Sequence, residues 1–174
     1  MRVVAGTHRG RRLEAPDGLE ARPTSGRARE ATFNRLESLD LIDGSVVLDL
    51  FAGSGALGIE ALSRGAAQVV FVDSSPRCVD AVRQNLSALG LTNQARVERS
   101  DAMRFLTDST ATFDLALLDP PYEFDGWDEL LTRLPSEYAV VESDRAIAVP
   151  DGWVELKSSR YGRATIAVLE REER

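Results

Sequence analysis

The sequence Val-Val-Leu-Asp-Leu-Phe-Ala-Gly-Ser-Gly-Ala-Leu-Gly occupies residues 46–58 and decides the fold class. Its first part is an apolar, β-branched run, which is typical of a buried strand. Gly53, Gly55 and Gly58 follow, and a helical pattern begins directly after them. A strand that turns through glycines into a helix is the nucleotide-binding layout of an α/β sheet, because glycine lets the backbone approach a ligand and a helix N-terminus presents free N–H groups.

The same glycine spacing also fits the fingerprint of dinucleotide-binding sheets, so the ligand has to be inferred from Asp49, at the carboxyl end of the predicted strand. A pyrophosphate would be repelled by a carboxylate at close range. S-adenosylmethionine carries no phosphate, and an anionic Asp49 would attract its ammonium group. Asp49 therefore favours S-adenosylmethionine over NAD, and a glycine-rich turn that binds nothing is the remaining alternative.

Length and composition exclude several classes of protein. A chain of 174 residues with 43% hydrophobic content is sufficient for one domain with a core. Cys78 and His8 are the only cysteine and histidine, so an internal disulfide is impossible and neither a metal site nor a Ser-His-Asp triad is expected. No apolar run reaches the ~18 residues of a membrane span, and the N-terminus lacks the apolar region of a signal peptide. We therefore expect a cytoplasmic protein without a bound metal.

The charge is distributed unevenly along the chain. The net charge is −7, but residues 1–35 hold eight arginines against four acidic residues, a net +4 that leaves −11 for the remainder. An arginine-rich end on an acidic body predicts a segment that contacts nucleic-acid phosphates, and a solvated charged surface is the alternative. The residues that we expect to contact RNA are Arg9, Arg11, Arg12, Arg22, Thr24, Arg27 and Arg29.

The order of predicted elements indicates an α/β fold. Residues 1–21 are expected to form a small β-hairpin extension, and residues 22–174 a single globular domain. A helix capped by Thr24 or Ser25 should end at Asp43-Gly44. The strands expected after residues 46–50 are 69–72, 95–99, 113–118, 138–142, 153–157 and 165–169, with a hairpin loop at 158–163; the helices expected between them are 55–64, a segment closed by Gly90, a segment around Met103 and 126–134. This pattern predicts a mostly parallel, Rossmann-like sheet with helices on both faces and an antiparallel C-terminal hairpin.

Acidic residues follow four of the predicted strands. They are Asp49, Asp73, Asp101 and Asp119. Ligands of such sheets bind beyond the carboxyl ends of the strands. Asp73 stands 20 residues after Gly53, where an acidic residue can accept hydrogen bonds from both ribose hydroxyls. Asp101 could accept from the adenine amino group or could instead cap the following helix.

The tetrapeptide Asp119-Pro120-Pro121-Tyr122 is the most specific chemical signal. Two prolines make the turn rigid and leave carbonyl groups free to accept hydrogen bonds. Together with the Asp119 carboxylate, such a carbonyl can hold both hydrogens of an exocyclic amine and direct its lone pair toward an electrophile. Tyr122 can stack on the base. The tetrapeptide therefore predicts methyl transfer to a nucleobase amine, with catalysis by positioning and electrostatics.

These motifs together resemble a known family. Residues 49–58 and 119–122 resemble the class I S-adenosylmethionine-dependent amino-methyltransferases. The further segments Arg2-Val-Val-Ala-Gly6, Gly10-Arg-Arg-Leu13, Arg22-Pro-Thr24, Arg29-Glu-Ala-Thr-Phe-Asn34, residues 48–66 and Tyr161-Gly162 make nearly the whole chain similar to the bacterial small-subunit rRNA guanine-N2 methyltransferase D family. Gly26 departs from that family, which usually has an acidic or polar residue there.

The resemblance implies an activity and a set of site residues. It implies methylation of a guanine-966-type site in 16S rRNA, within the small ribosomal subunit or an assembly intermediate. We expect a monomer, although the sequence leaves the oligomeric state open. The resemblance implies that residues Asp119, Pro120, Pro121 and Tyr122 hold the guanine amine. The implied cofactor-binding residues are Asp49, Phe51, Ala52, Gly53, Ser54, Gly55, Asp73, Ser74, Asp101 and Ala102, and the arginine-rich N-terminal unit is implied to contact rRNA.

Three alternative functions stay open from the sequence. An adenine-N6 methyltransferase acting on DNA or RNA would use the same tetrapeptide, because its geometry suits either amine. A NAD-dependent oxidoreductase would need a proton-handling residue, for which only the poorly placed His8 is available. A non-catalytic RNA-binding assembly factor would tolerate loss of the Asp119 carboxylate. The sequence does not distinguish naked rRNA from a protein-bearing particle as the substrate.

Overall fold

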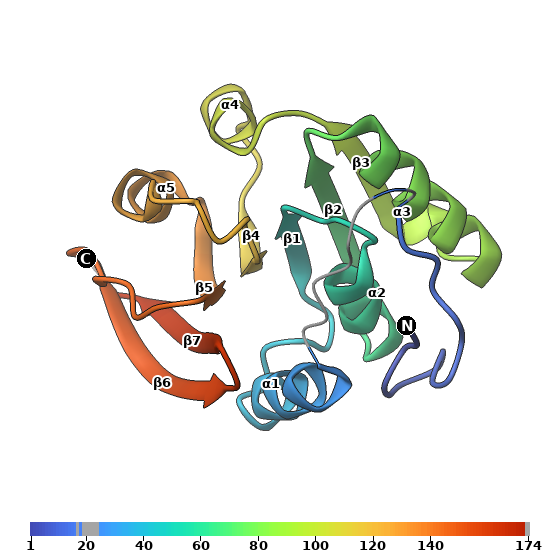
Figure 1. Cartoon of the computed structure of the whole chain (residues 1–174), viewed down its shortest axis with the longest axis horizontal. Helices are drawn as coiled ribbons and strands as arrows, with labels where there is room; N and C mark the ends of the chain where they lie inside the picture. Colours follow the sequence, from blue (N-terminus) through green and yellow to red (C-terminus); the bar gives the residue numbers. More distant parts are fainter. Residues whose placement is uncertain (17, 19–24, 173–174) are drawn as a thin grey trace.

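A computed structural model describes residues 1–16, 18 and 25–172 of the chain. Its centre is a seven-stranded sheet with the order β3-β2-β1-β4-β5-β7-β6. The strands are β1 (Val46–Leu50), β2 (Gln68–Asp73), β3 (Ala95–Arg99), β4 (Phe113–Leu118), β5 (Ser136–Ser143), β6 (Trp153–Tyr161) and β7 (Ala164–Arg171). The first five strands pair in parallel, and β7 runs antiparallel to both β5 and β6. The predicted parallel sheet with an antiparallel C-terminal hairpin is confirmed (Figure 1).

Helices cover both faces of this sheet. They are α1 (Gly26–Ser38), α2 (Ala56–Ser63), α3 (Pro76–Leu89), α4 (Ala102–Asp108) and α5 (Trp127–Arg133), with a 3₁₀ turn at Thr92–Gln94. One core cluster joins α1, α2 and α3 to the sheet and the other joins α4 and α5 to it, on opposite sides (Figure 1). Side chains alternate between the two clusters along a strand, because successive residues of a strand point to opposite faces.

The alternation is clear in β4, which precedes the predicted amine-binding turn at residues 119–122, and in β5, the strand that pairs with it. Leu117 of β4 and Val140 of β5 belong to the cluster under α1 and α2. Leu118 and Val141, one residue further along each strand, belong to the cluster under α4 and α5. The two strands are therefore in phase, which fixes the face toward which the residues after them point.

The first helix begins at one of its predicted capping residues but ends earlier than predicted. Ser25 caps α1, its Oγ accepting from the backbone N–H of Ala28 at 3.1 Å, and Ser75 caps α3 in the same way through Cys78 at 3.4 Å. The expected end of the first helix at Asp43-Gly44 is wrong, because α1 ends at Ser38. Asp40 then adopts a positive φ of 59°, which carries the chain into a turn well before Gly44.

The C-terminal hairpin is longer than the sequence pattern indicates. The expected loop at 158–163 is wrong, since Ser158, Ser159 and Arg160 pair with β7 and only Gly162-Arg163 form the turn. β6 is the edge strand, so its outward side chains meet water and polar residues are tolerated along it. A serine- and arginine-rich run on an edge strand is therefore easily mistaken for a loop.

The N-terminal unit packs onto the body of the protein. In place of a regular hairpin, a single antiparallel bridge joins Arg2 and Arg12. Val3 and Leu13 are each 2% exposed and join the same core cluster as α1 and α2. The predicted boundary between residues 21 and 22 lies outside the described residues. Among the described residues, no helix is long and apolar enough to cross a membrane.

Candidate active site

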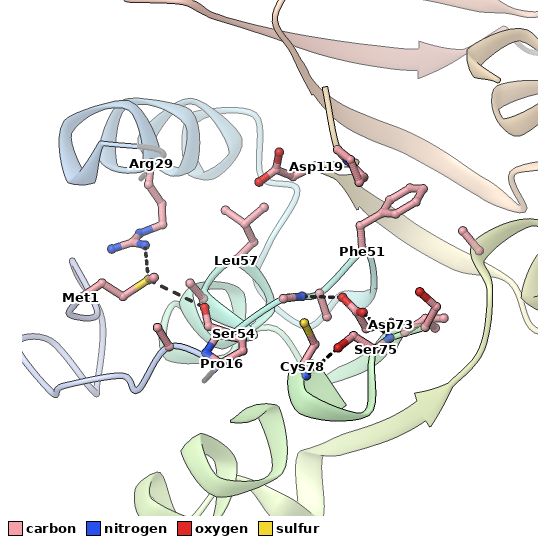
Figure 2. Close-up of a pocket in the computed structure, with 18 of the residues that line it drawn as sticks. Met1, Pro16, Arg29, Phe51, Ser54, Leu57, Asp73, Ser75, Cys78 and Asp119 are labelled. Carbon is pink, nitrogen blue, oxygen red and sulfur yellow. Dashed lines mark hydrogen bonds between the residues drawn. The ribbon is translucent and has the colours of Figure 1, made fainter. Parts of the chain in front are cut away.

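A cavity of about 1000 Å³ opens at the carboxyl ends of the parallel strands. Figure 2 shows the residues that surround it, from the glycine loop, the ends of β2 and β4, helix α1 and the N-terminal segment. It brings together most of the predicted site: Phe51, Ala52, Gly53, Ser54, Asp73, Ser74, Asp101, Ala102, Asp119, Pro121 and Tyr122 all line it. Asp49, Gly55 and Pro120 are not among its lining residues.

The glycine loop has a conformation that its sequence requires. Gly53 and Gly55 have φ values of +57° and +82°, a region that other residues seldom adopt. Gly58 is needed for a different reason, because a Cβ there would lie 2.3 Å from a ring carbon of Phe71 on β2. Phe51 also has a positive φ, +99°, although it is aromatic, and such strain in a ring-bearing residue is characteristic of functional sites.

Asp49 lies beneath this loop. Its side chain is 1% exposed and one oxygen accepts from the backbone N–H of Gly58 at 2.9 Å. Burial raises the pKa of Asp49 to about 8, with smaller contributions from Asp119 and Asp73, while the Gly58 hydrogen bond opposes the rise. The sequence analysis expects an anionic Asp49 that attracts the ammonium group of the ligand, and this role stays a prediction. In the structure Asp49 braces the loop that forms the cavity wall.

Asp73 is oriented by the backbone on both sides. One carboxylate oxygen accepts from Gly53 N–H and the other from Ser75 N–H, each at 2.9 Å. These bonds fix the carboxylate at the cavity edge (Figure 2). Because a carboxylate has about four lone-pair positions, ribose hydroxyls could still donate to it. Ribose binding by Asp73 stays a prediction.

Asp101 performs one of the two roles that the sequence left open, that of a helix cap. Its Oδ1 atom accepts from the backbone N–H of Arg104 at 3.0 Å, so it caps α4. It also lines the cavity beside Ala102. Capping fixes the position of the side chain, and adenine binding by Asp101 stays a prediction.

The proline turn is held against the glycine loop by contacts that the sequence analysis missed. The Phe124 ring meets Phe51 edge-on, with centroids 5.5 Å apart, and meets Trp127 at 5.2 Å. The carbonyl oxygen of Tyr122 accepts from the Arg145 guanidinium at 2.9 Å. Aromatic residues shortly after the tetrapeptide were the available signal for the first contact, whereas no local pattern points to Arg145.

The predicted RNA-contacting arginines divide into exposed and buried groups. Arg9, Arg11, Arg12 and Arg27 are exposed, although Arg11 donates to the Ala88 carbonyl at 3.0 Å and Arg12 pairs with Glu14 at 3.2 Å. Arg22 and Thr24 lie outside the described residues. Arg29 does not fit a surface phosphate contact, because it is only 5% exposed.

Arg29 belongs to a buried ionic cluster around Glu60 of α2, which the sequence analysis also missed. Glu60 is 0% exposed, pairs with Arg64 at 2.9 Å and lies 3.9 Å from Arg29. Its two oxygens accept from the backbone N–H groups of Val4 and Ala5 at 2.9 and 3.0 Å. The Arg29 side chain in turn donates to the Arg2 carbonyl at 2.6 Å. Glu60 therefore fixes the N-terminal segment as a wall of the cavity.

Comparisons with known proteins agree with this geometry. The family described as "Conserved hypothetical protein 95" matches residues 1–170. The chain is 36% identical to "Ribosomal RNA small subunit methyltransferase D" of Escherichia coli K12, covering 99% of this chain and 90% of that protein, and 33% identical to its Haemophilus influenzae namesake over 93% and 89%. A solved structure from Escherichia coli described as a methyltransferase superposes with a TM-score of 0.88 at 32% identity, covering 100% and 99% of the two chains. The Rossmann-like methyltransferase fold expected from the resemblance is confirmed.

Proposed function

Because the chain belongs to the family described as "Conserved hypothetical protein 95" and is similar over nearly its whole length to small-subunit rRNA methyltransferases, we propose that it methylates 16S rRNA. The methyl group goes from S-adenosylmethionine to the exocyclic N2 amine of a guanine, at a site of the guanine-966 type. The single observation that carries this proposal is that the glycine loop and the Asp119–Tyr122 turn line one cavity.

The residues present fit S-adenosylmethionine. Gly53 and Ser54 contribute backbone to the cavity wall, and the space beside the Gly53 Cα is open to a ligand. Asp73 and Asp101 supply carboxylates, fixed by hydrogen bonds, for the hydroxyl and amino groups of the ligand. The apolar wall includes Phe51, Ala52 and Ala102. When bound, S-adenosylmethionine supplies a methyl group on a positively charged sulfur, which needs no phosphate-binding residue.

The chain's own contribution to the reaction is positioning. Asp119 and a carbonyl of the rigid proline turn accept the two hydrogens of the guanine amine, which orients its lone pair toward the methyl donor. Tyr122 stacks on the base. Bound S-adenosylmethionine would supply the methyl group to this nitrogen, and Asp119 or water would accept the amine proton, which becomes acidic only as the methyl group is transferred. A target that is paired or stacked in the RNA must first be flipped out of its stack.

The exposed arginines of the N-terminal unit supply the RNA contact. Arg9, Arg12 and Arg27 are on the surface, and Arg2 to Val4 continue from that unit into the wall of the cavity. Phosphates bound by this unit would therefore lie close to the base in the site. The protein acts as a monomer in the cytoplasm, on the small subunit or an assembly intermediate.

The test is methyl incorporation into 30S particles that lack the modification, followed by nucleoside analysis. We expect N2-methylguanosine at one position, and loss of at least a hundredfold in rate for Asp119→Ala. The formation of N6-methyladenosine alone would establish the adenine-N6 alternative. Full complementation of a methyltransferase-deficient strain by Asp119→Ala would show instead a binding factor whose catalysis is dispensable.

A further inference from the structure

The Arg29 side chain extends from α1 into the wall of the large cavity, where it is only 5% exposed. Its guanidinium has a different partner on each side. Nη2 donates to the Arg2 carbonyl oxygen at 2.6 Å, and Nε lies 3.9 Å from the Glu60 carboxylate. Nη1 donates to the sulfur of Met1 at 3.5 Å. The first two partners are a backbone carbonyl and a buried carboxylate, whereas the third is the end of a residue that is 45% exposed.

The Met1 sulfur is the meeting point of two donors. The Ser54 hydroxyl donates to the same sulfur at 3.8 Å from the glycine loop, so that the sulfur lies between Ser54 and Arg29 (Figure 2). Ser54 is 8% exposed, and its carbonyl accepts from the Asn85 amide at 2.9 Å, which fixes its position. A thioether is a weak hydrogen-bond acceptor, and a methionine side chain changes conformation readily. Two buried donors thus converge on a place in the cavity where their present acceptor is weak and movable.

The cavity contains few cations that could bind an anionic group. In the described part of the chain, Arg2 and Arg29 are the basic residues that line it. Arg2 is exposed, and its guanidinium donates to the Gly10 carbonyl at 2.7 Å. Arg29 is therefore the buried cation of the cavity wall. Its burial favours an anionic group of a small ligand inside the cavity over a phosphate of an RNA backbone, which would have to reach it from the surface.

We propose that Arg29 and Ser54 bind the carboxylate of the methionine portion of S-adenosylmethionine, an inference that rests on the proposed function through its cofactor. The carboxylate replaces the Met1 sulfur as their acceptor, and the Met1 side chain turns aside, a change of the kind common on binding. Hydrogen bonds from a guanidinium to a carboxylate are about twice as strong as those between neutral groups. The exchange of acceptors therefore favours the bound cofactor.

The position of Arg29 agrees with the sites predicted for the other end of the cofactor. Asp73, the predicted ribose-binding residue, lies on the opposite side of Ser54 from Arg29 (Figure 2). An extended ligand with its ribose at Asp73 and its carboxylate at Arg29 would pass along the glycine loop. Asp119 lines the same cavity, so a carboxylate held at Arg29 would help to position the methyl donor for the amine that Asp119 accepts.

The experiment compares S-adenosylhomocysteine with its decarboxylated analogue, which keeps the adenosine, the sulfur and the amine. The affinities of both compounds are measured by calorimetry for wild type, Arg29→Met and Arg35→Met. Arg35 is an exposed residue of the same helix and is not among the residues that line the cavity. Arg35→Met is therefore the matched control for the same chemical change.

We expect wild type and Arg35→Met to bind S-adenosylhomocysteine about tenfold to a hundredfold more tightly than the analogue. In Arg29→Met this ratio should fall by about tenfold, because a thioether cannot donate a hydrogen bond to the carboxylate. The ratio is taken on one preparation, so it is independent of the folded fraction. Ser54→Ala, which removes a neutral donor, should lower the ratio by about twofold to tenfold.

A measurement on wild type covers the case in which Arg29→Met fails to fold. Met1 and Met103 are the two methionines of the chain, so their methyl signals can be followed by NMR in protein that carries ¹³C-methyl methionine. S-adenosylhomocysteine should shift the Met1 signal as the sulfur leaves Arg29, and the decarboxylated analogue should shift it less. Equal shifts with the two compounds would overturn the inference.

The contrary outcomes are separable. An unchanged ratio in Arg29→Met, with both affinities lowered equally, would assign Arg29 only a structural role beside Glu60 and overturn this inference while leaving the proposed function intact. Wild-type protein with an Arg29-dependent ratio that methylates no guanine in 30S particles would defeat the proposed function and leave the carboxylate site in place. Wild-type protein that binds neither compound would defeat both.

Discussion

Asp49 and Glu60 are the two deeply buried acids of the β1–α2 unit, at 1% and 0% exposure, yet their environments are opposite. Asp49 accepts from one backbone N–H, that of Gly58, and burial raises its pKa to about 8. Glu60 meets two arginines and two backbone N–H groups. Burial lowers the pKa of Arg29 from its ordinary value, and the charge of Glu60 opposes that shift.

The difference shows how one short helix supports two functions. On one side of α2, a carboxyl group that burial pushes toward its neutral form holds the glycine loop over the strand. On the other side, a carboxylate with compensating cations holds the N-terminal segment against the cavity. A buried charge persists only when it is paired and hydrogen-bonded, whereas a lone acid shifts its pKa.

The largest loss of stability should come from a substitution that breaks the ionic cluster around Glu60. Glu60→Ala leaves Arg29 and Arg64 buried without their carboxylate and removes the acceptor of Val4 and Ala5. We expect a loss of about 3–5 kcal/mol in the free energy of unfolding, measured by urea denaturation. Glu37→Ala is the control, because Glu37 pairs with Arg64 from a side chain that is 47% exposed. Equal losses of stability in Glu60→Ala and Glu37→Ala would contradict the special role of the buried carboxylate.

A smaller effect is expected at Gly58, which donates to Asp49. Gly58→Ala places a Cβ 2.3 Å from the Phe71 ring, so α2 must move away from β2. We expect a loss of about 1–3 kcal/mol in stability, together with weaker S-adenosylhomocysteine binding by calorimetry because the loop shifts. Gly44→Ala, at an open turn with no atom within 4 Å, should leave ligand affinity at the wild-type value.

The contribution of the buried Asp49 carboxyl group to stability can be tested by varying the pH. The folded pKa of Asp49, about 8, lies above the ordinary value near 3.8, so the folded state binds more protons between these values. The stabilisation from this group is complete below the lower pKa and is lost as pH rises through about 8. Asp49→Asn removes the titrating group and, with it, this loss of stability at rising pH. Its stability relative to wild type should therefore increase between pH 5 and pH 8 in urea titrations.

The control for this titration is Asp114→Asn. Asp114 also accepts from a backbone N–H, that of Val46 at 2.7 Å, but it is exposed at the opposite end of the same sheet. Its variant should show no comparable rise with pH. A flat difference between Asp49→Asn and wild type would mean that Asp49 is ionised throughout this range.

The smallest expected effect is on the salt dependence of RNA binding, and it distinguishes the exposed arginines from the buried Arg29. Arg12→Ala removes one exposed cation and should reduce the slope of log affinity for rRNA against log salt by about one, measured by filter binding. Arg29→Ala should instead lower thermal stability, because it breaks the cluster around Glu60. An unchanged salt slope in Arg12→Ala, Arg9→Ala and Arg27→Ala would exclude the N-terminal unit as a phosphate contact.

Local patterns were sufficient for much of this protein. Gly53 and Gly55 need a positive φ, and the strand before them is apolar except for Asp49, so the loop and its place at the sheet edge followed from residue types. Ser25 caps its helix as its position indicated. Polar runs on an edge strand escaped the same reasoning, because Ser158 to Arg160 have water on one side and backbone pairing on the other.

The sequence by itself determined the fold class, the family resemblance and the residues that gather at one edge, because hydrophobic period, glycine conformation and proline rigidity are local properties. Only the tertiary structure decided which partners each buried acid has. Asp49 and Glu60 differ in their neighbours, and those neighbours come from residues far along the chain, such as Val4 and Arg29.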